Sequence, residues 1–229
     1  MQIINATDNI RITNTHSTAS LLAKVLWITT AGFVVTAFGT AIAPDGIGGL
    51  GYGAVVLIGF ALLFGVRFAA QRSPALGLAV FYLFTFIMGI QISPIVSHYL
   101  HLANGQAIVF NAAVTTAAGM AVMALVAQIA NFNYQKVGNF AIAGLFALII
   151  VGIASAFFHF ISPTTYSIIG LVIFSVLLLV DFMRLRDTPA NSTPVFLALS
   201  IYLDALNIFL FLLQIFGNGG GNRRDSKWS

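Results

Sequence analysis

The sequence predicts an all-α integral membrane protein, a bundle of seven transmembrane helices. Hydrophobic residues make up 59% of the 229 residues and charged residues only 7%, whereas a soluble domain carries about 25% charged residues. Seven apolar stretches each approach or exceed the length of about 20 residues that a helix needs to cross the hydrocarbon core. These stretches are continuously apolar and do not alternate, which excludes a transmembrane β-barrel.

Turn-forming residues separate the apolar stretches and set their order along the chain. The first stretch follows the polar residues 1–20 and ends before Asp45-Gly46, and Ser73-Pro74 separates the second from the third. The later connections carry Asn104-Gly105, Ser162-Pro163 and Thr188-Pro189. Because the connections are short, consecutive helices should run antiparallel in one bundle. The expected spans are Leu21–Ala43, Leu50–Ala70, Pro74–Val96, Ala107–Ala130, Gly138–Ile161, Thr164–Met183 and Val195–Gly217.

Two polar tails are expected to flank a single membrane domain. Residues 1–20 are polar and lack the basic start, short apolar core and cleavage site of a signal peptide, so we expect a cytoplasmic N-terminal tail. The membrane domain should cover residues 21–217. Residues 218–229 are rich in Gly and charge, and this composition predicts a disordered C-terminal tail.

The distribution of Lys and Arg predicts the orientation in the membrane. The cations that fall on one side are Arg11, Lys24, Arg67, Arg72, Lys136, Arg184 and Arg186, and those on the other are Arg223, Arg224 and Lys227. The positive-inside rule therefore places the N-terminus in the cytoplasm and the C-terminus outside. The basic C-terminal tail leaves an alternative, in which the last stretch is a re-entrant segment and the helices span six times.

Several classes of chemistry are excluded by composition. The chain contains no Cys and no Glu, so a zinc-thiolate site, a cysteine nucleophile and an H-E-x-x-H metalloprotease are all ruled out. We find no complete catalytic constellation and do not expect an enzyme. The basic residues are scattered singly at the ends of the spans, which fits membrane anchors and not a nucleic-acid partner.

Asp181 and Asp204 are the acidic residues inside the apolar stretches. A carboxylate at membrane depth is costly, so such residues usually face the interior of a bundle and serve function. Asp181 lies near the cytoplasmic end of Thr164–Met183 and Asp204 about ten residues into the next span, so antiparallel packing can bring them together. Two neighbouring carboxyls should titrate as a unit that shares a proton. Asn207 lies three residues after Asp204 and is expected on the same helical face, lining a polar path.

A purely structural role for the two aspartates is the alternative. Asp181 would then reach the interface beside Arg184, and Asp204 would bond to neighbours such as Asn207. The depth of Asp204 argues against this alternative. Arg72 ends the second span on the same side as Asp181, so three ionisable groups are expected near one mouth of the bundle.

Three segments resemble the Bax inhibitor family, also called the transmembrane Bax inhibitor motif family. They are FYLFTFIMGIQISPIVSHY (Phe81–Tyr99), SIIGLVIFSVLLLVDFMRL (Ser167–Leu185) and ALSIYLDALNIFLFLLQIFG (Ala198–Gly217). With the seven spans, the resemblance covers residues 20–217, and the short chain resembles the bacterial members.

The resemblance implies a fold in which six helices surround a central seventh helix. It also implies a pH-sensitive calcium leak in the bacterial inner membrane. By this resemblance Asp181 and Asp204 form a proton-sensing pair that binds calcium weakly and transiently, and Arg72 latches the cytoplasmic mouth, with Arg67 as a nearby competitor for that role. Membrane lipid, calcium and protons are then the expected partners, calcium is the permeant ion, and no tightly bound cofactor is expected.

Two other functions stay open. In the first, the chain is a non-transporting interaction protein that modulates an FtsH-type membrane-anchored protease. Residues 1–20 would then be the segment that contacts the protease. An intramembrane aspartyl hydrolase is the weaker alternative, because Asp204 follows Tyr202-Leu203 but the sequence contains no G-x-G-D motif.

Overall fold

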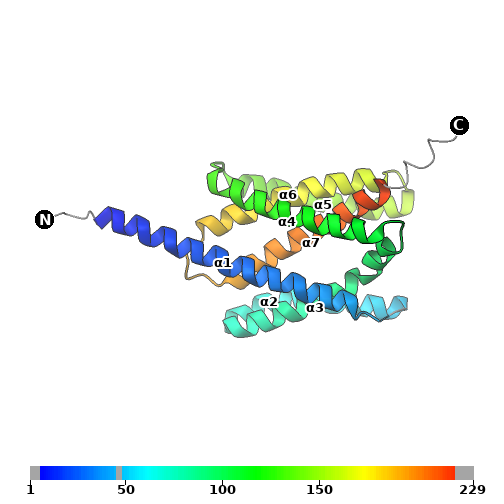
Figure 1. The fold of residues 1–229 in the computed structure, drawn as a ribbon, viewed down its shortest axis with the longest axis horizontal. Helices are drawn as coiled ribbons and strands as arrows, with labels where there is room; N and C mark the ends of the chain where they lie inside the picture. Colours follow the sequence, from blue (N-terminus) through cyan, green and yellow to red (C-terminus); the bar gives the residue numbers. More distant parts are fainter. Residues whose placement is uncertain (1–5, 45–47, 220–229) are drawn as a thin grey trace. The chain divides into compact units, whose positions relative to one another are not determined.

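Seven α-helices make up the computed structural model, which describes residues 6–44 and 48–219. They are α1 (Ala6–Ala41), α2 (Gly49–Arg72), α3 (Pro74–Leu100), α4 (Gly105–Ile129), α5 (Tyr134–Phe158), α6 (Pro163–Asp187) and α7 (Pro194–Gly219) (Figure 1). No strand occurs among these described residues. Every helix contains a segment long and apolar enough to cross a membrane. The prediction of an all-α membrane protein with seven helices, each long and apolar enough to span, is therefore confirmed.

Several helices extend beyond the apolar stretches that predict them. α1 begins at Ala6, and only its part from Leu21 onward has the composition of a span. α6 continues to Asp187, four residues past the expected end. Backbone hydrogen bonding continues a helix through polar residues until a turn signal stops it, so hydropathy does not mark its end. Residues 1–5 of the expected N-terminal tail, and all but two residues of the expected disordered C-terminal tail, lie outside the described residues.

Side-chain hydrogen bonds cap the starts of α5 and α6, and a residue in the left-handed backbone conformation follows the end of α5. The Asn133 side chain accepts a bond of 3.1 Å from the backbone N–H of Lys136 and caps α5. At the other end of α5, His159 adopts φ 50°. Ser162 Oγ accepts a bond of 3.1 Å from the N–H of Thr165 and caps α6. These contacts satisfy backbone groups that a helix terminus leaves without partners.

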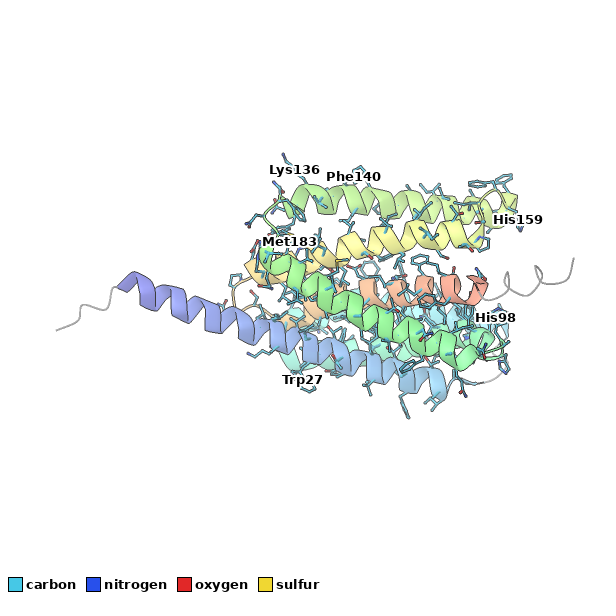
Figure 2. The ribbon with its side chains drawn as sticks, turned by 45° about the horizontal axis from the view of Figure 1, so that its top comes forward. Trp27, His98, Lys136, Phe140, His159 and Met183 are labelled. Carbon is cyan, nitrogen blue, oxygen red and sulfur yellow. The ribbon has the colours of Figure 1, made fainter. Side chains whose placement is uncertain are left out.

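The surface carries many large apolar side chains, as lipid contact requires. Trp27 on α1 and Phe140 on α5 project outward (Figure 2) and are 75% and 82% exposed. The spans of α4 and α5 are each only 11% buried, whereas α7 is 67% buried, the largest share of the seven. The predicted position of α7 at the centre of the bundle stays a prediction.

Two compact units divide the chain: residues 1–91 with 184–199, and residues 92–183 with 200–229. The boundaries fall inside α3, α6 and α7, so each of these helices contributes to both units. In the first unit, α1 and α3 are joined by hydroxyl bonds from Thr36 Oγ1 to the Thr85 carbonyl and from Thr40 Oγ1 to the Gly89 carbonyl, both 3.0 Å.

The second unit contains both aspartates singled out by the sequence. Its helical segments come from α3, α4, α5, α6 and α7. Tyr166 on α6 donates a bond of 3.3 Å to the Leu148 carbonyl on α5, and Val180 on α6 lies close to Gly138 on α5. These contacts fix α6 against α5, and hydrogen bonds also join α6 to α7.

Candidate functional site

Both intramembrane aspartates are buried in spanning helices of the second unit. Asp181 lies six residues before the end of α6 at Asp187, and Asp204 lies ten residues after the start of α7 at Pro194. Their exposed fractions are 6% and 8%. A buried carboxyl inside a span needs polar partners, because neither lipid nor apolar side chains solvate it.

A serine joins the two helices at the level of Asp181. Ser200 Oγ on α7 donates a hydrogen bond to Asp181 Oδ2 on α6. Sequence reasoning missed Ser200, although one signal was present: it precedes Asp204 by four residues, one turn of the same helix. Residues at this spacing share a helical face. Ser200, Asp204 and Asn207 therefore form one polar face of α7.

Asn207 makes its described bond within its own helix. Its Nδ2 donates to the Leu203 carbonyl at 2.8 Å, and the side chain is half-buried. If the two aspartates had a purely structural role, Asp204 would be expected to bond to Asn207. The described bond of Asn207 is instead to the Leu203 carbonyl. Its role in lining a polar path stays a prediction.

Arg72 occupies the last position of α2 and is exposed, as is Arg67. Arg72 belongs to the first compact unit and Asp181 to the second, so the predicted latch between them stays a prediction. At the exposed end of α6, Arg186 forms an ion pair of 2.9 Å with Asp187. An ion pair so accessible to solvent contributes about 0–1 kcal/mol to stability.

The described side-chain oxygens near Asp181 are too few for a tight metal site. Within residues 6–44 and 48–219, no three His, Cys, Asp or Glu side chains gather as a metal site. Calcium prefers six to eight oxygen ligands, and the Asp181 carboxylate and the Ser200 hydroxyl are the side-chain oxygens that a hydrogen bond brings together here. Any calcium at this site would take further ligands from carbonyls and water.

Comparison with known proteins assigns the family. The model of the family described as "Inhibitor of apoptosis-promoting Bax1" matches residues 18–221. An uncharacterized protein of Neisseria meningitidis serogroup A is 30% identical over 139 residues, which cover 61% of each chain, so the match spans about three fifths of that relative. An uncharacterized protein of Pseudomonas aeruginosa is 29% identical over 168 residues, or 73% of this chain and 75% of the relative.

A relative from Streptococcus pyogenes serotype M1 carries the description "uncharacterized membrane protein". It is 26% identical over 174 residues, which cover 72% of this chain and 73% of the relative. The family match covers nearly all of the seven spanning helices, and the resemblance of the three sequence segments is thereby confirmed. The chain belongs to the Bax inhibitor family and is a multi-pass membrane protein of that family.

Proposed function

We propose that this protein is a pH-sensitive calcium leak of the bacterial inner membrane, with Asp181 and Asp204 as its ion and proton site. One observation carries the proposal: two carboxyls are buried in adjacent spanning helices of one compact unit. A charged residue at this depth costs about 2.5–3.5 kcal/mol or more, so a role in moving ions or protons explains its presence better than packing does. The resemblance of the sequence to the Bax inhibitor family implies the same function.

The chemistry of the site fits passage of the ion better than storage. Calcium is a hard cation that binds oxygen, and tight protein sites supply six to eight such ligands. The aspartate pair supplies few, so the ion is held weakly and leaves again, as conduction requires. No tightly bound cofactor, catalytic group or nucleic-acid partner enters this mechanism; its partners are membrane lipid, calcium and protons.

Protonation of the pair gives the leak its pH dependence. While Asp181 is ionised, we expect its attraction to Arg72 to hold the cytoplasmic mouth closed. A proton shared by the two carboxyls removes that attraction, and moderate acidification opens the path. Stronger acidification neutralises both carboxyls and weakens calcium binding. In this mechanism the N-terminus is cytoplasmic and the C-terminus outside.

Calcium flux into liposomes, measured with a trapped indicator across a pH series, tests the proposal. Asp204→Asn keeps the size of the side chain and removes its charge, so flux should fall on the order of tenfold, the change that about 1.4 kcal/mol of lost ion binding produces. Asp187→Asn is the matched control, because Asp187 is exposed and paired with Arg186. A larger effect of the control would refute the role of the buried pair.

A wild-type protein that passes no calcium at any pH would refute the leak itself. That result would favour the alternative of an interaction protein that modulates a membrane-anchored protease. Co-purification with such a protease, with and without residues 1–20, would then be the decisive measurement.

A further inference from the structure

A second polar contact joins α6 and α7 far from the aspartates. Ser167 Oγ on α6 lies 2.7 Å from Gln214 Oε1 on α7 and 2.7 Å from the Pro163 carbonyl of its own helix. Ser167 is fully buried, at 0% exposure, and Gln214 is half-buried. The two helices therefore carry a polar contact near each end of their interface.

The Ser167 hydroxyl has a single proton, so it cannot donate to both oxygens at once. Both contacts are satisfied when Gln214 presents its amide N–H to Ser167 Oγ and Ser167 donates to the Pro163 carbonyl. The two ends of a Gln amide are similar in shape and are assigned from such networks. In this orientation the Gln214 carbonyl oxygen points away from Ser167 and can serve as a ligand for a cation or its hydration water.

An aromatic ring lies between the two polar contacts. Phe211 is 8% exposed, and a Cβ added at Gly170 would lie only 2.3 Å from its ring. The absence of a side chain at Gly170 is therefore what lets the ring seat against α6. The rings of Tyr166 and Phe174 flank Phe211, with centroids 6.0 Å and 5.9 Å away.

The three contacts follow one antiparallel register. Gly170 precedes Asp181 by eleven residues, and Phe211 follows Ser200 by eleven. Eleven residues make three helical turns, about 16 Å along the axis. The Ser167–Gln214 contact then lies one turn beyond the ring. The interface thus runs from a polar pair, through an aromatic seal, to a second polar pair.

We propose that Phe211 seated on Gly170 is the hydrophobic seal of the leak, and that Ser167 and Gln214 form a second polar station for a hydrated cation on the side away from the aspartates. This inference rests on the proposed function and assigns residues to the far half of its path. A ring of this kind closes a path by excluding water, and the two polar stations give the ion ligands before and after the seal.

Thiol accessibility tests the seal without any calcium measurement. The chain contains no Cys, so single-cysteine variants at Gln214 and Asn207 report on either side of Phe211. A membrane-impermeant methanethiosulfonate reagent is applied from the side on which α7 ends. The Gln214→Cys variant should react, and the Asn207→Cys variant should be protected. Adding Phe211→Ala should make the Asn207→Cys variant react as fast as the Gln214→Cys variant does.

Three further variants keep the test specific. Phe209→Ala is the control, since Phe209 lies at similar depth on another face of α7, and it should leave the Asn207→Cys variant protected. Phe211→Leu retains apolar bulk and should retain protection, which guards against misfolding of Phe211→Ala. Gly170→Ala should remove protection while leaving Phe211 in the chain, because the added methyl displaces the ring.

Two outcomes would overturn the seal: reaction of the Asn207→Cys variant from that side with Phe211 intact, or protection that persists in both Phe211→Ala and Gly170→Ala. In calcium-loaded liposomes, Phe211→Ala should raise the leak above the wild-type rate at acidic pH, where the attraction between Asp181 and Arg72 no longer closes the cytoplasmic mouth. A wild type without flux, combined with the expected accessibility pattern, would refute the leak and leave Phe211 as a barrier to water only. A conducting wild type with an unaffected Phe211→Ala variant would refute the seal alone.

Discussion

Gly89→Ala should destabilise the protein, because α1 and α3 touch backbone to backbone at this residue. A Cβ at Gly89 would lie 2.2 Å from the Thr36 carbonyl oxygen and 2.9 Å from the Thr40 nitrogen. Gly39 faces the same contact, and a Cβ there would lie 2.4 Å from the Phe86 carbonyl oxygen. Backbone atoms cannot swing aside as a flexible side chain can, so the helices themselves must separate.

The size of the effect follows from that separation. Ordinary contact begins at 3.4 Å and the clash lies at 2.2 Å, so the backbones must move apart by about 1.2 Å, the difference of the two. The interhelical bonds of Thr36 and Thr40, both 3.0 Å, would then be lost. Each contributes about 0.6 kcal/mol, because each hydroxyl has one proton and can donate it to a carbonyl of α1 instead. With an overpacking cost of about 1–3 kcal/mol, the total is roughly 2–4 kcal/mol.

Unfolding of the purified protein by titration with sodium dodecyl sulfate, followed by circular dichroism, measures this free energy. Gly119→Ala in α4 is the matched control, because nothing lies within 4 Å of a Cβ there. Replacing Gly by Ala in open space should leave stability unchanged or raise it by up to about 1 kcal/mol. A Gly89→Ala variant as stable as Gly119→Ala would refute the close contact of α1 and α3.

Other outcomes are expected from the same structure. Gln91→Leu loses the 3.1 Å bond to the Val55 carbonyl and should lower the free energy of unfolding by about 0.6–1.7 kcal/mol in the same titration. His159→Gly should raise it by up to about 1 kcal/mol, because φ 50° strains a residue that has a Cβ. Arg72→Ala should raise calcium flux at neutral pH and flatten its rise on acidification, whereas Arg67→Ala should not; equal effects would remove the latch. A C-terminal reporter should be accessible from outside the cell and an N-terminal one should not, and two internal termini would favour a re-entrant last segment.

The sequence predicts the helices well because the membrane imposes a simple rule. About 20 apolar residues are needed per span, and all seven predicted spans correspond to helices. Helix ends are predicted less well, since polar residues continue α1 back to Ala6 and α6 on to Asp187. Hydropathy does not record how far a helix continues into polar residues.

Residues of the candidate site differ in how visible they are in a sequence. Asp181 and Asp204 stand out because a charge in a span is expensive. Ser200 and Ser167 do not, since a serine can satisfy its hydroxyl on its own helix at little cost. Their significance appears only with the register of α6 against α7, which depends on packing between segments and not on the composition of either.

The importance of Gly89 and Gly170 also depends on how the helices pack, and substitutions at the two glycines should give different experimental outcomes. At Gly89 the missing side chain lets two backbones meet, and a Cβ would clash with main-chain atoms 2.2 Å away. At Gly170 the missing side chain leaves room for the ring of Phe211, and a Cβ would clash with atoms of that ring, which can rotate away. Substitution at Gly89 should therefore lower stability and leave thiol protection of α7 unchanged. Substitution at Gly170 should remove that protection at a smaller cost in stability, because a displaced ring relieves the clash without moving a helix.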